Sequence, residues 1–403
     1  MNAHGSAGRE ADRGTERSAI DPVDACTPCL ARSWLLGRLA GHLDRHRDRL
    51  EELLGLGDAE LIAALGGRHR ETIEAEYAAF DPAGARSAVL GTGSEAVCRC
   101  RPRYPPGLLD LEAPPAVLHI AGGRGRPPTL LATPGVAIVG SREPSPYGSE
   151  VAAVLGRGLG IAGVTVISGL ARGIDASAQR GAIDADGPTV AVLAGAAERP
   201  YPPRARALHR RIVRTGAVLS EMPPGTPARR WMFPARNRII AALSALTVVV
   251  EARAGSGAMI TAAQAERLQR RIGAVPGRIS SPLVHGPHEL LRRGALLVDG
   301  PECILEALFG PGGFPGLPTN PAAALDPASQ TVLDALAAGA DTAAALARAR
   351  LEAGAGLAVL AGLELSGLIV RRPGGGYAAP IRPRMAGAPR AGEGQAAGPS
   401  ERG

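Results

Sequence analysis

The sequence contains no lysine, so arginine supplies all 45 of its basic residues. A P-loop ATPase binds nucleotide phosphates through a lysine, and enzymes that form Schiff bases use a lysine amine. The missing lysine therefore argues against both of these classes of protein. Arginine keeps its positive charge and grips phosphate through a planar fork of N–H groups, so phosphate binding remains open to this chain.

Long apolar runs are also missing. Residues 1–18 are polar and lack the apolar centre of a signal peptide, and no run approaches the length of a membrane span. We therefore expect a soluble cytoplasmic protein without a membrane partner.

Cysteine is scarce, with five residues in the chain. Cys26-x-x-Cys29 and Cys98-x-Cys100 can be considered together as a zinc site, but the two spacings fit poorly and no histidine pair completes them. We therefore favour free or buried thiols, and we predict neither a metal nor a cofactor. Few cysteines also agree with a reducing compartment.

The formal net charge is +7 and the pI is about 9.7. Such a balance favours acidic partners, and nucleic acid is the first of these. A composition biased toward arginine, alanine and glycine is the alternative explanation. The charge total alone therefore does not identify a ligand.

Two regions precede the main domain. Residues 1–30 are rich in glycine, alanine and charge, and we expect them to be a disordered tail. Apolar residues recur with a helical period over 31–82, which predicts a small helical module of the helix-hairpin-helix or SAM-like kind. It could bind a DNA backbone or serve only for packing. A proline-rich connector and lead-in follows over 83–130.

Residues 131–309 alternate short β-rich runs with segments long enough for one helix. This alternation predicts an α/β domain with a mostly parallel sheet covered on both faces. We expect a glycine- and proline-rich linker over 310–324, a winged-helix-like module over 325–382 and a disordered tail over 383–403. The predicted strands are 136–140, 164–169, 189–195, 217–221, 246–252, 272–277 and 295–298.

Glycine-rich turns follow the first two predicted strands of this domain. Ligands of parallel α/β sheets lie at the carboxyl ends of the strands, where helix N-termini present free N–H groups. Neither turn has the G-x-G-x-x-G pattern of a dinucleotide site. We interpret them as phosphate-binding turns, although tight turns without a ligand are the alternative. The candidates are Gly140, Ser141, Arg142, Ser168, Gly169 and Arg172.

The segment 229–238 contains four arginines, a tryptophan and a phenylalanine. Alternating charged and aromatic side chains suit a single strand, whose bases stack while its phosphates pair with cations. In the alternative interpretation Trp231 and Phe233 belong to the core and Arg236 pairs with Glu251. The candidates for binding are Phe233, Arg236, Asn237 and Arg238.

Two further elements extend this basic surface. Ser256 and Gly257 open a predicted helix and form a second candidate phosphate site. Arg204 begins a run of arginines before the fourth strand, which is either a basic track or a solvated helix face. We find no Ser-His-Asp set, no H-E-x-x-H and no carboxylate pair at a metal spacing, so we do not expect an enzyme.

The motifs VAIVGSR, SGLARGID, FPARNRIIAAL, SGAMITA and AVPG occur in this order between residues 136 and 277. In this order they resemble the DNA-processing protein A family, called DprA or Smf, and the resemblance covers roughly residues 33–309. The carboxyl-terminal module is similar to the winged helix of many members. The resemblance implies an extended Rossmann-like fold, a homodimer and binding of single-stranded DNA. It also implies protection of incoming strands in natural transformation and loading of the RecA recombinase onto them.

Mapped onto this chain, the family's DNA pocket falls on Gly140, Ser141 and Arg142, with Ser168 and Gly169 opposite. Phe233, Arg236 and Asn237 complete it, and Arg204 lies near a position where members often carry a basic residue. Two alternatives stay open. One is a nucleotide phosphoribohydrolase on a related fold, and the other is a regulator that binds duplex DNA through the carboxyl-terminal module.

Overall fold

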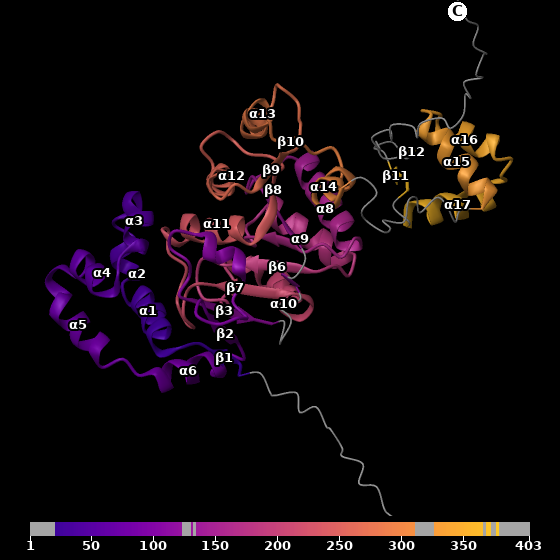
Figure 1. Cartoon of the computed structure of the whole chain (residues 1–403). Helices are drawn as coiled ribbons and strands as arrows, with labels where there is room; N and C mark the ends of the chain where they lie inside the picture. The colour runs from indigo at the N-terminus through magenta and orange to yellow at the C-terminus, as the bar shows by residue number, and fades with distance from the viewer. Residues whose placement is uncertain are drawn as a thin grey trace, which may run out of the picture. The chain divides into compact units, whose positions relative to one another are not determined.

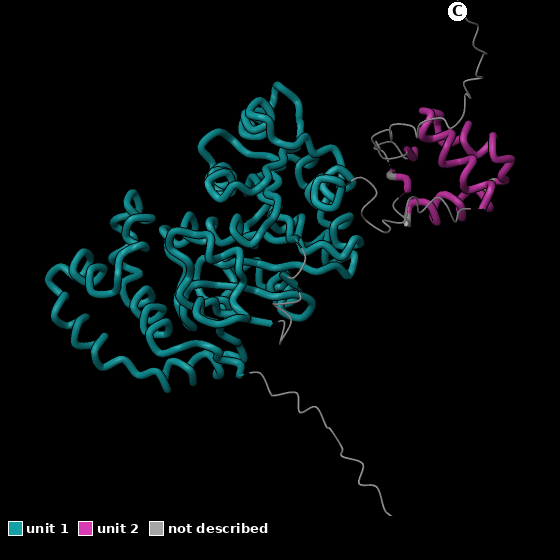
Figure 2. The backbone as a smooth tube through the Cα atoms, in the orientation of Figure 1, with its two compact units in different colours: residues 1–315 teal, residues 316–403 magenta. Residues whose placement is uncertain are grey.

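The computed structural model describes residues 21–122, 130–131, 134–310, 326–365, 368–371 and 376–378. The chain divides into two compact units, residues 1–315 and 316–403 (Figure 2). No helix among the described residues is long and apolar enough to cross a membrane.

Unit 1 is built on a sheet of ten strands in the order β1-β2-β3-β7-β6-β5-β4-β8-β9-β10, drawn side by side in Figure 1. The seven strands from β4 to β10 in chain order run parallel to their neighbours among these seven, and each of the seven predicted strand segments overlaps one of them. Their apolar residues are buried because helices cover both faces. The bounds are β4 (Gly135–Val139), β5 (Val166–Ser168), β6 (Thr189–Val192), β7 (Ala217–Ser220), β8 (Ser244–Val249), β9 (Arg271–Ala274) and β10 (Leu296–Leu297).

The helices of this domain divide between the two faces of the sheet. Core residues of α9 and α10 pack on one face, and those of α11, α12 and α13 pack on the other. The mostly parallel α/β fold is therefore confirmed. The bounds are α8 (Pro146–Ile161), α9 (Ile174–Asp184), α10 (Arg206–Thr215), α11 (Met232–Ala242), α12 (Gly257–Arg267), α13 (His285–Arg292) and α14 (Pro301–Phe309).

Glycines let α8 and α9 approach each other closely. A Cβ added at Gly156 would lie 2.1 Å from the Ala178 oxygen, and one added at Gly181 would lie 2.2 Å from the Ala153 oxygen. Each helix therefore presents a glycine where the backbone of the other passes. This contact fixes α9, whose first turn follows the loop after β5.

Three strands extend the sheet beyond the prediction, namely β1 (Val23–Asp24), β2 (Glu95–Cys98) and β3 (Val117–Ala121). β3 pairs antiparallel with both β7 and β2, and β1 pairs parallel with β2. β2 and β3 therefore lie within the segment predicted as a proline-rich connector and lead-in over 83–130, and β1 lies within the tail predicted over 1–30. The sequence did not reveal them because they lie outside the alternation of strands and helices on which the prediction rested.

The amino-terminal helices share a core with the sheet domain. Trp231 is fully buried among leucines of these helices. Its indole N–H donates to the Ala40 oxygen at 2.8 Å, and its backbone N–H donates to Asp44 at 3.1 Å. The helical module is thus packed onto the sheet domain. The bounds are α1 (Thr27–Arg38), α2 (Ala40–Leu43), α3 (Leu50–Gly55), α4 (Asp58–Leu65), α5 (Arg70–Ala78) and α6 (Pro82–Gly91).

Unit 2 is a winged helix. Asp326 caps its first helix by accepting hydrogen bonds from the amides of Ala328 and Ser329 at 3.0 and 3.1 Å. The linker predicted beyond residue 310 and the tail predicted over 383–403 lie outside the described residues. The elements are α15 (Pro327–Ala337), α16 (Thr342–Arg348), α17 (Ala353–Leu365) and the antiparallel strands β11 (Val370–Arg371) and β12 (Tyr377–Ala378).

Candidate nucleic-acid interface

The strand order puts a topological switch point at the carboxyl ends of β4 and β8, the position at which open α/β sheets have their ligand crevice. β4 lies between β5 and β8, and the chain winds from β4 toward β7 on one side and from β8 toward β10 on the other. The loops that leave β4 and β8 therefore diverge, and such a switch point is where open α/β sheets bind ligands. Gly140, Ser141 and Arg142 follow β4 directly.

Glu251 holds the loop after β4 in place. The Ser141 amide donates to the Glu251 backbone oxygen at 2.6 Å. The Glu251 carboxylate accepts from the Ser145 hydroxyl at 2.6 Å and from its amide at 2.8 Å. Ser145 in turn caps α8 by accepting from the Gly148 amide. Glu251 therefore acts on the β4 loop, and the alternative that pairs it with Arg236 is wrong.

Arg142 stands over an aromatic pair at the edge of the crevice. Its guanidinium carbon lies 5.3 Å from the centre of the Phe233 ring. The Tyr201 ring lies 5.5 Å from the same ring. Arg142 and Tyr201 are exposed and Phe233 is half-buried, so a cation and a ring from two loops meet a second ring from the first turn of α11. Such a set can stack a base and neutralise a phosphate.

Arg236 lies beneath this surface and is 7% exposed. Its guanidinium donates to the Val192 backbone oxygen, and its Nε donates to the Asn237 side-chain oxygen at 3.1 Å. A Cβ at Gly169 would lie 1.9 Å from one guanidinium nitrogen, so only glycine leaves room for this arginine. Burial lowers the pKa of Arg236 to about 10, which keeps it protonated at neutral pH.

Asp175 orders the loop after β5 and balances the buried arginine. Its carboxylate accepts from the amides of Gly169 at 3.0 Å and Ala171 at 3.4 Å. Burial raises the pKa of Asp175, and this effect outweighs the opposite effect of Arg236 and these amides. The loop also needs Gly173, which has φ of +85° and approaches the Ser141 oxygen too closely for a side chain. The loops after β4 and β5 therefore fit each other directly.

The N-terminus of α12 lies on the other side of the crevice from the loop after β5. The Asn237 side-chain amide donates to the Gly257 oxygen at 3.2 Å, which joins α11 to the start of α12. Ser256 stands at the N-cap, and its buried hydroxyl has no partner among the described residues. No atom would lie within 4 Å of a Cβ at Gly257. The first amides of α12 therefore remain accessible to an anion.

Two of the predicted site residues have structural positions instead. Ser168 is fully buried, and its hydroxyl donates to the Ile138 oxygen at 2.7 Å. Arg238 forms a buried ion pair with Glu221 at 2.7 Å, with side chains that are 7% and 8% exposed. The positions of Ser168 and Arg238 do not support contact with DNA. Trp231, as described above, belongs to the core, as the alternative interpretation expected.

Basic side chains continue from the crevice across α9 and α10. Arg172 donates to the Arg142 oxygen at 3.0 Å and also pairs with Glu143. Together with Arg204 it lines a cavity of about 230 Å³, to which Arg180 and Arg211 also contribute. An adjoining open cavity of about 1010 Å³ is lined by further arginines, namely Arg199, Arg206, Arg210, Arg211 and Arg214.

Sequence reasoning missed Tyr201, Arg180 and Arg199 in this surface. Tyr201 lies between two prolines, in a turn that the strand and helix periods do not describe. Arg180 stands alone on α9, so no run of charge marked it. The presence of an aromatic residue beside prolines after a strand end was the available signal for Tyr201.

The described parts define a doubly wound α/β protein with a basic crevice at its switch point, together with a winged helix. A family model described as DNA recombination-mediator protein A matches residues 95–309, and a model of the DprA winged helix domain matches residues 317–375. The chain belongs to this family, which confirms the resemblance seen in the sequence.

Individual relatives agree with this assignment. A DNA processing protein DprA of Mycobacterium tuberculosis is 38% identical over 300 residues, which cover 73% of this chain and 71% of the relative. Protein Smf of Escherichia coli is 40% identical over 219 residues, which cover 54% of this chain and 58% of the relative. The X-ray structure of DprA from Streptococcus pneumoniae matches with a TM-score of 0.57 at 30% identity, over 70% of this chain and 99% of that chain.

Proposed function

We propose that the crevice at the ends of β4, β5 and β8 binds single-stranded DNA. The observation that carries this proposal is the meeting of Arg142, Phe233 and Tyr201 above the buried Arg236. Phosphates would approach Arg142 and the N-terminus of α12, where the space around the Cβ position of Gly257 is open.

The exposed rings favour a single strand over a duplex. A base can stack on an aromatic ring only when its face is free, and the bases of a duplex already stack on each other. Arg142 lies against the ring that would receive the base, so one nucleotide could contact both groups. Recognition of this kind depends on the backbone and the base face, and it is therefore largely independent of sequence.

The carboxylates beside the crevice support binding without turnover. Asp175 accepts from two backbone amides, and Glu251 accepts from both the hydroxyl and the amide of Ser145. Each of them is therefore occupied in ordering a loop. A hydrolase would need a carboxylate or imidazole that is free to activate water. Release of free base from a nucleoside monophosphate would favour the phosphoribohydrolase alternative and overturn this part of the proposal.

We further infer that the chain protects the bound strand and helps to load the RecA recombinase onto it, in natural transformation or in general recombination. Membership in a family described as recombination mediators supports this inference. The same membership supports a homodimer. Acceleration of RecA filament formation on strands coated by a single-strand-binding protein would test the loading step, and an unchanged rate would contradict it.

The experiment that tests the ligand is a fluorescence-anisotropy titration with single-stranded and duplex DNA of equal length. We expect tighter binding of the single strand, and we expect log affinity to fall with log salt by roughly 0.7 for each phosphate neutralised. A preference for duplex would instead favour a regulator acting through the winged helix. A flat salt dependence would contradict the whole proposal.

A further inference from the structure

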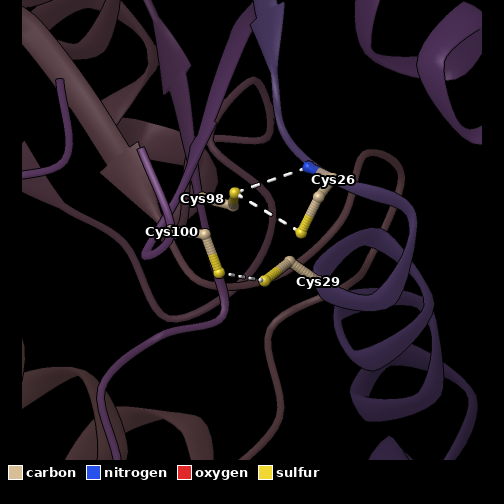
Figure 3. A group of neighbouring side chains, drawn as sticks. All are labelled: Cys26, Cys29, Cys98 and Cys100. Carbon is tan, nitrogen blue, oxygen red and sulfur yellow. Dashed lines mark hydrogen bonds between the residues drawn. The ribbon is translucent and has the colours of Figure 1, made fainter. Parts of the chain in front are cut away.

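Four of the five cysteines lie together at the edge of the sheet, in positions shown in Figure 3. The sulfur atoms of Cys26, Cys29, Cys98 and Cys100 all lie within 4.8 Å of one another. The spacing along the chain argued against a shared site, whereas the fold brings the four sulfurs together. Spacing along the chain did not reveal the site because a strand pairing creates it.

That pairing joins β1 to β2. Asp24 of β1 is aligned with Val97 of β2 in parallel register. Cys26 follows the end of β1, and Cys98 ends β2, so parallel pairing brings these two residues to the same edge. Cys29 and Cys100 then follow on the helix and the turn that leave the two strands.

A helix N-terminus and a backbone amide lie beside these thiols. Cys26 is the N-cap of α1, and Cys29 lies in its first turn, where the partial positive charge of the helix N-terminus would favour a thiolate bound to a metal. The Cys26 amide also donates to the Cys98 sulfur at 3.4 Å. Such N–H to sulfur hydrogen bonds orient and stabilise thiolate ligands around metals.

We propose that Cys26, Cys29, Cys98 and Cys100 together bind one zinc ion. Zinc bound by four thiolates is tetrahedral, with Zn–S bonds of about 2.3 Å and therefore sulfur–sulfur edges of about 3.8 Å. The Cys29–Cys100 sulfurs lie 3.7 Å apart, and the Cys26–Cys98 sulfurs lie 3.8 Å apart. These two distances between sulfur atoms therefore already match the edges of a tetrahedral zinc site.

The same dimensions distinguish a single ion from larger centres. An iron–sulfur cluster places several metal and sulfide atoms between its cysteines, so it needs a wider set of thiolates than this one. All four thiols are free in the structure. Two separate disulfides, Cys26–Cys98 and Cys29–Cys100, would use the same residues. Two disulfides would not require the four sulfur atoms to lie around a common point, as they do here.

The zinc ion would have a structural role. Four protein ligands close the coordination sphere and leave no position for a substrate. Cys98 is fully buried and Cys29 is 5% exposed, whereas Cys100 is exposed and gives the ion a path into the site. The ion would link the start of α1 to β2, two segments that lie 72 residues apart between Cys26 and Cys98. It would thereby fix the helical module on the sheet, independently of the DNA crevice.

Metal analysis of the full-length protein tests this proposal directly. The protein is purified in the reduced state, dialysed against buffer without chelator and measured by mass spectrometry for metals. We expect one zinc ion per chain. We also expect Cys98→Ser and Cys29→Ser to lose it, while Cys303→Ser, which changes the cysteine on α14, retains it. Zinc that persists in Cys29→Ser would overturn the assignment of ligands.

A measurement on the unaltered chain covers the case in which these variants fail to fold. Zinc is removed with a chelator under reducing conditions, and Co²⁺ alone is titrated into the protein. We expect saturation at one Co²⁺ per chain, with the intense visible bands of tetrahedral thiolate coordination and displacement by Zn²⁺. Four reactive thiols that bind neither metal, two disulfides in reduced preparations, or iron with acid-labile sulfide would each overturn the proposal.

Discussion

Arg142 and Arg236 carry the same charge in the same crevice but in different surroundings. Arg142 is exposed over Phe233, whereas Arg236 is buried against Gly169 and the backbone of β6. The first can move to meet a phosphate at little cost. The second is part of the wall, because it donates to the Val192 oxygen at the end of β6 and packs against Gly169 after β5. Substitutions at the two positions should therefore have different effects.

Arg142→Ala should weaken single-strand binding about tenfold, which corresponds to about 1.4 kcal/mol. The melting temperature should stay unchanged because the side chain is exposed. Anisotropy titrations across salt measure the affinity, and the slope against log salt should fall by roughly 0.7. Arg293→Ala is the matched control, since Arg293 is an exposed arginine just before β10, at the amino ends of the parallel strands and away from the crevice at their carboxyl ends. Equal losses in both variants would contradict the assignment.

Gly169→Ala should destabilise the protein and also reduce DNA binding. The new methyl group would occupy the place of the Arg236 guanidinium, which lies 1.9 Å from the ideal Cβ position. We expect a loss of about 1–3 kcal/mol in the free energy of unfolding, as for other overpacked sites. Urea denaturation measures it. Gly91→Ala is the control, because Gly91 lies in α6 with open space around its Cβ position. Stability of Gly169→Ala equal to that of the control would refute this packing.

Sequence reasoning found the crevice residues on strand ends better than those on helices. Gly140 and Arg142 lie just after the predicted strand, so the end of that strand alone places them at the carboxyl edge of the sheet. On α11 the positions 236 and 238 are two residues apart and point to different sides of the helix. Arg236 therefore faces the strand ends while Arg238 pairs with Glu221, and a run of arginines does not reveal which is which.

At the scale of elements, the antiparallel strand β3 connects the amino-terminal helical module to the parallel strands. It pairs with β7 on one side and β2 on the other, and its His119 meets Ser33 of α1 at 2.9 Å. The seven parallel strands were predictable because each is an apolar run followed by a helix. β1, β2 and β3 were not, since no such alternation of single strands and helices surrounds them: six α-helices separate β1 from β2, and no α-helix separates β2 from β3.

His119 should make the stability of the protein depend on pH. Burial lowers its pKa to about 4, from 6.5 for an exposed histidine. The folded state therefore resists protonation, and its stability is full above pH 6.5 and declines as the pH falls toward 4. Between pH 8 and pH 5 the histidine should remove about 2 kcal/mol from the free energy of unfolding.

Urea denaturation of the wild type and of His119→Gln at both pH values isolates this effect. Glutamine keeps a polar partner for Ser33 but does not titrate. The decline toward acid should therefore be smaller in the variant by about 2 kcal/mol. Parallel curves for the two proteins would show that His119 does not titrate between its folded and unfolded states as proposed.

At the scale of the whole molecule, Trp231 joins the amino-terminal helices to the domain that carries the crevice. It lies two residues before Phe233 and donates to Ala40 of α2. Trp231→Phe should therefore lower stability by about 1–3 kcal/mol through the lost hydrogen bond and the volume left empty. A thermal melt followed by circular dichroism measures the loss. An unchanged melting temperature would contradict the shared core.

The central claim is that a base of a single strand stacks on Phe233 beside Arg142. Ultraviolet cross-linking of a strand that carries 5-iodouracil, followed by mass spectrometry of the digested protein, tests this contact most directly. We predict cross-links to the peptide between Arg230 and Arg236 or to Tyr201, and their loss in Phe233→Ala when Tyr201 is also replaced. Cross-links confined to the winged helix, or to α10 alone, would contradict the account.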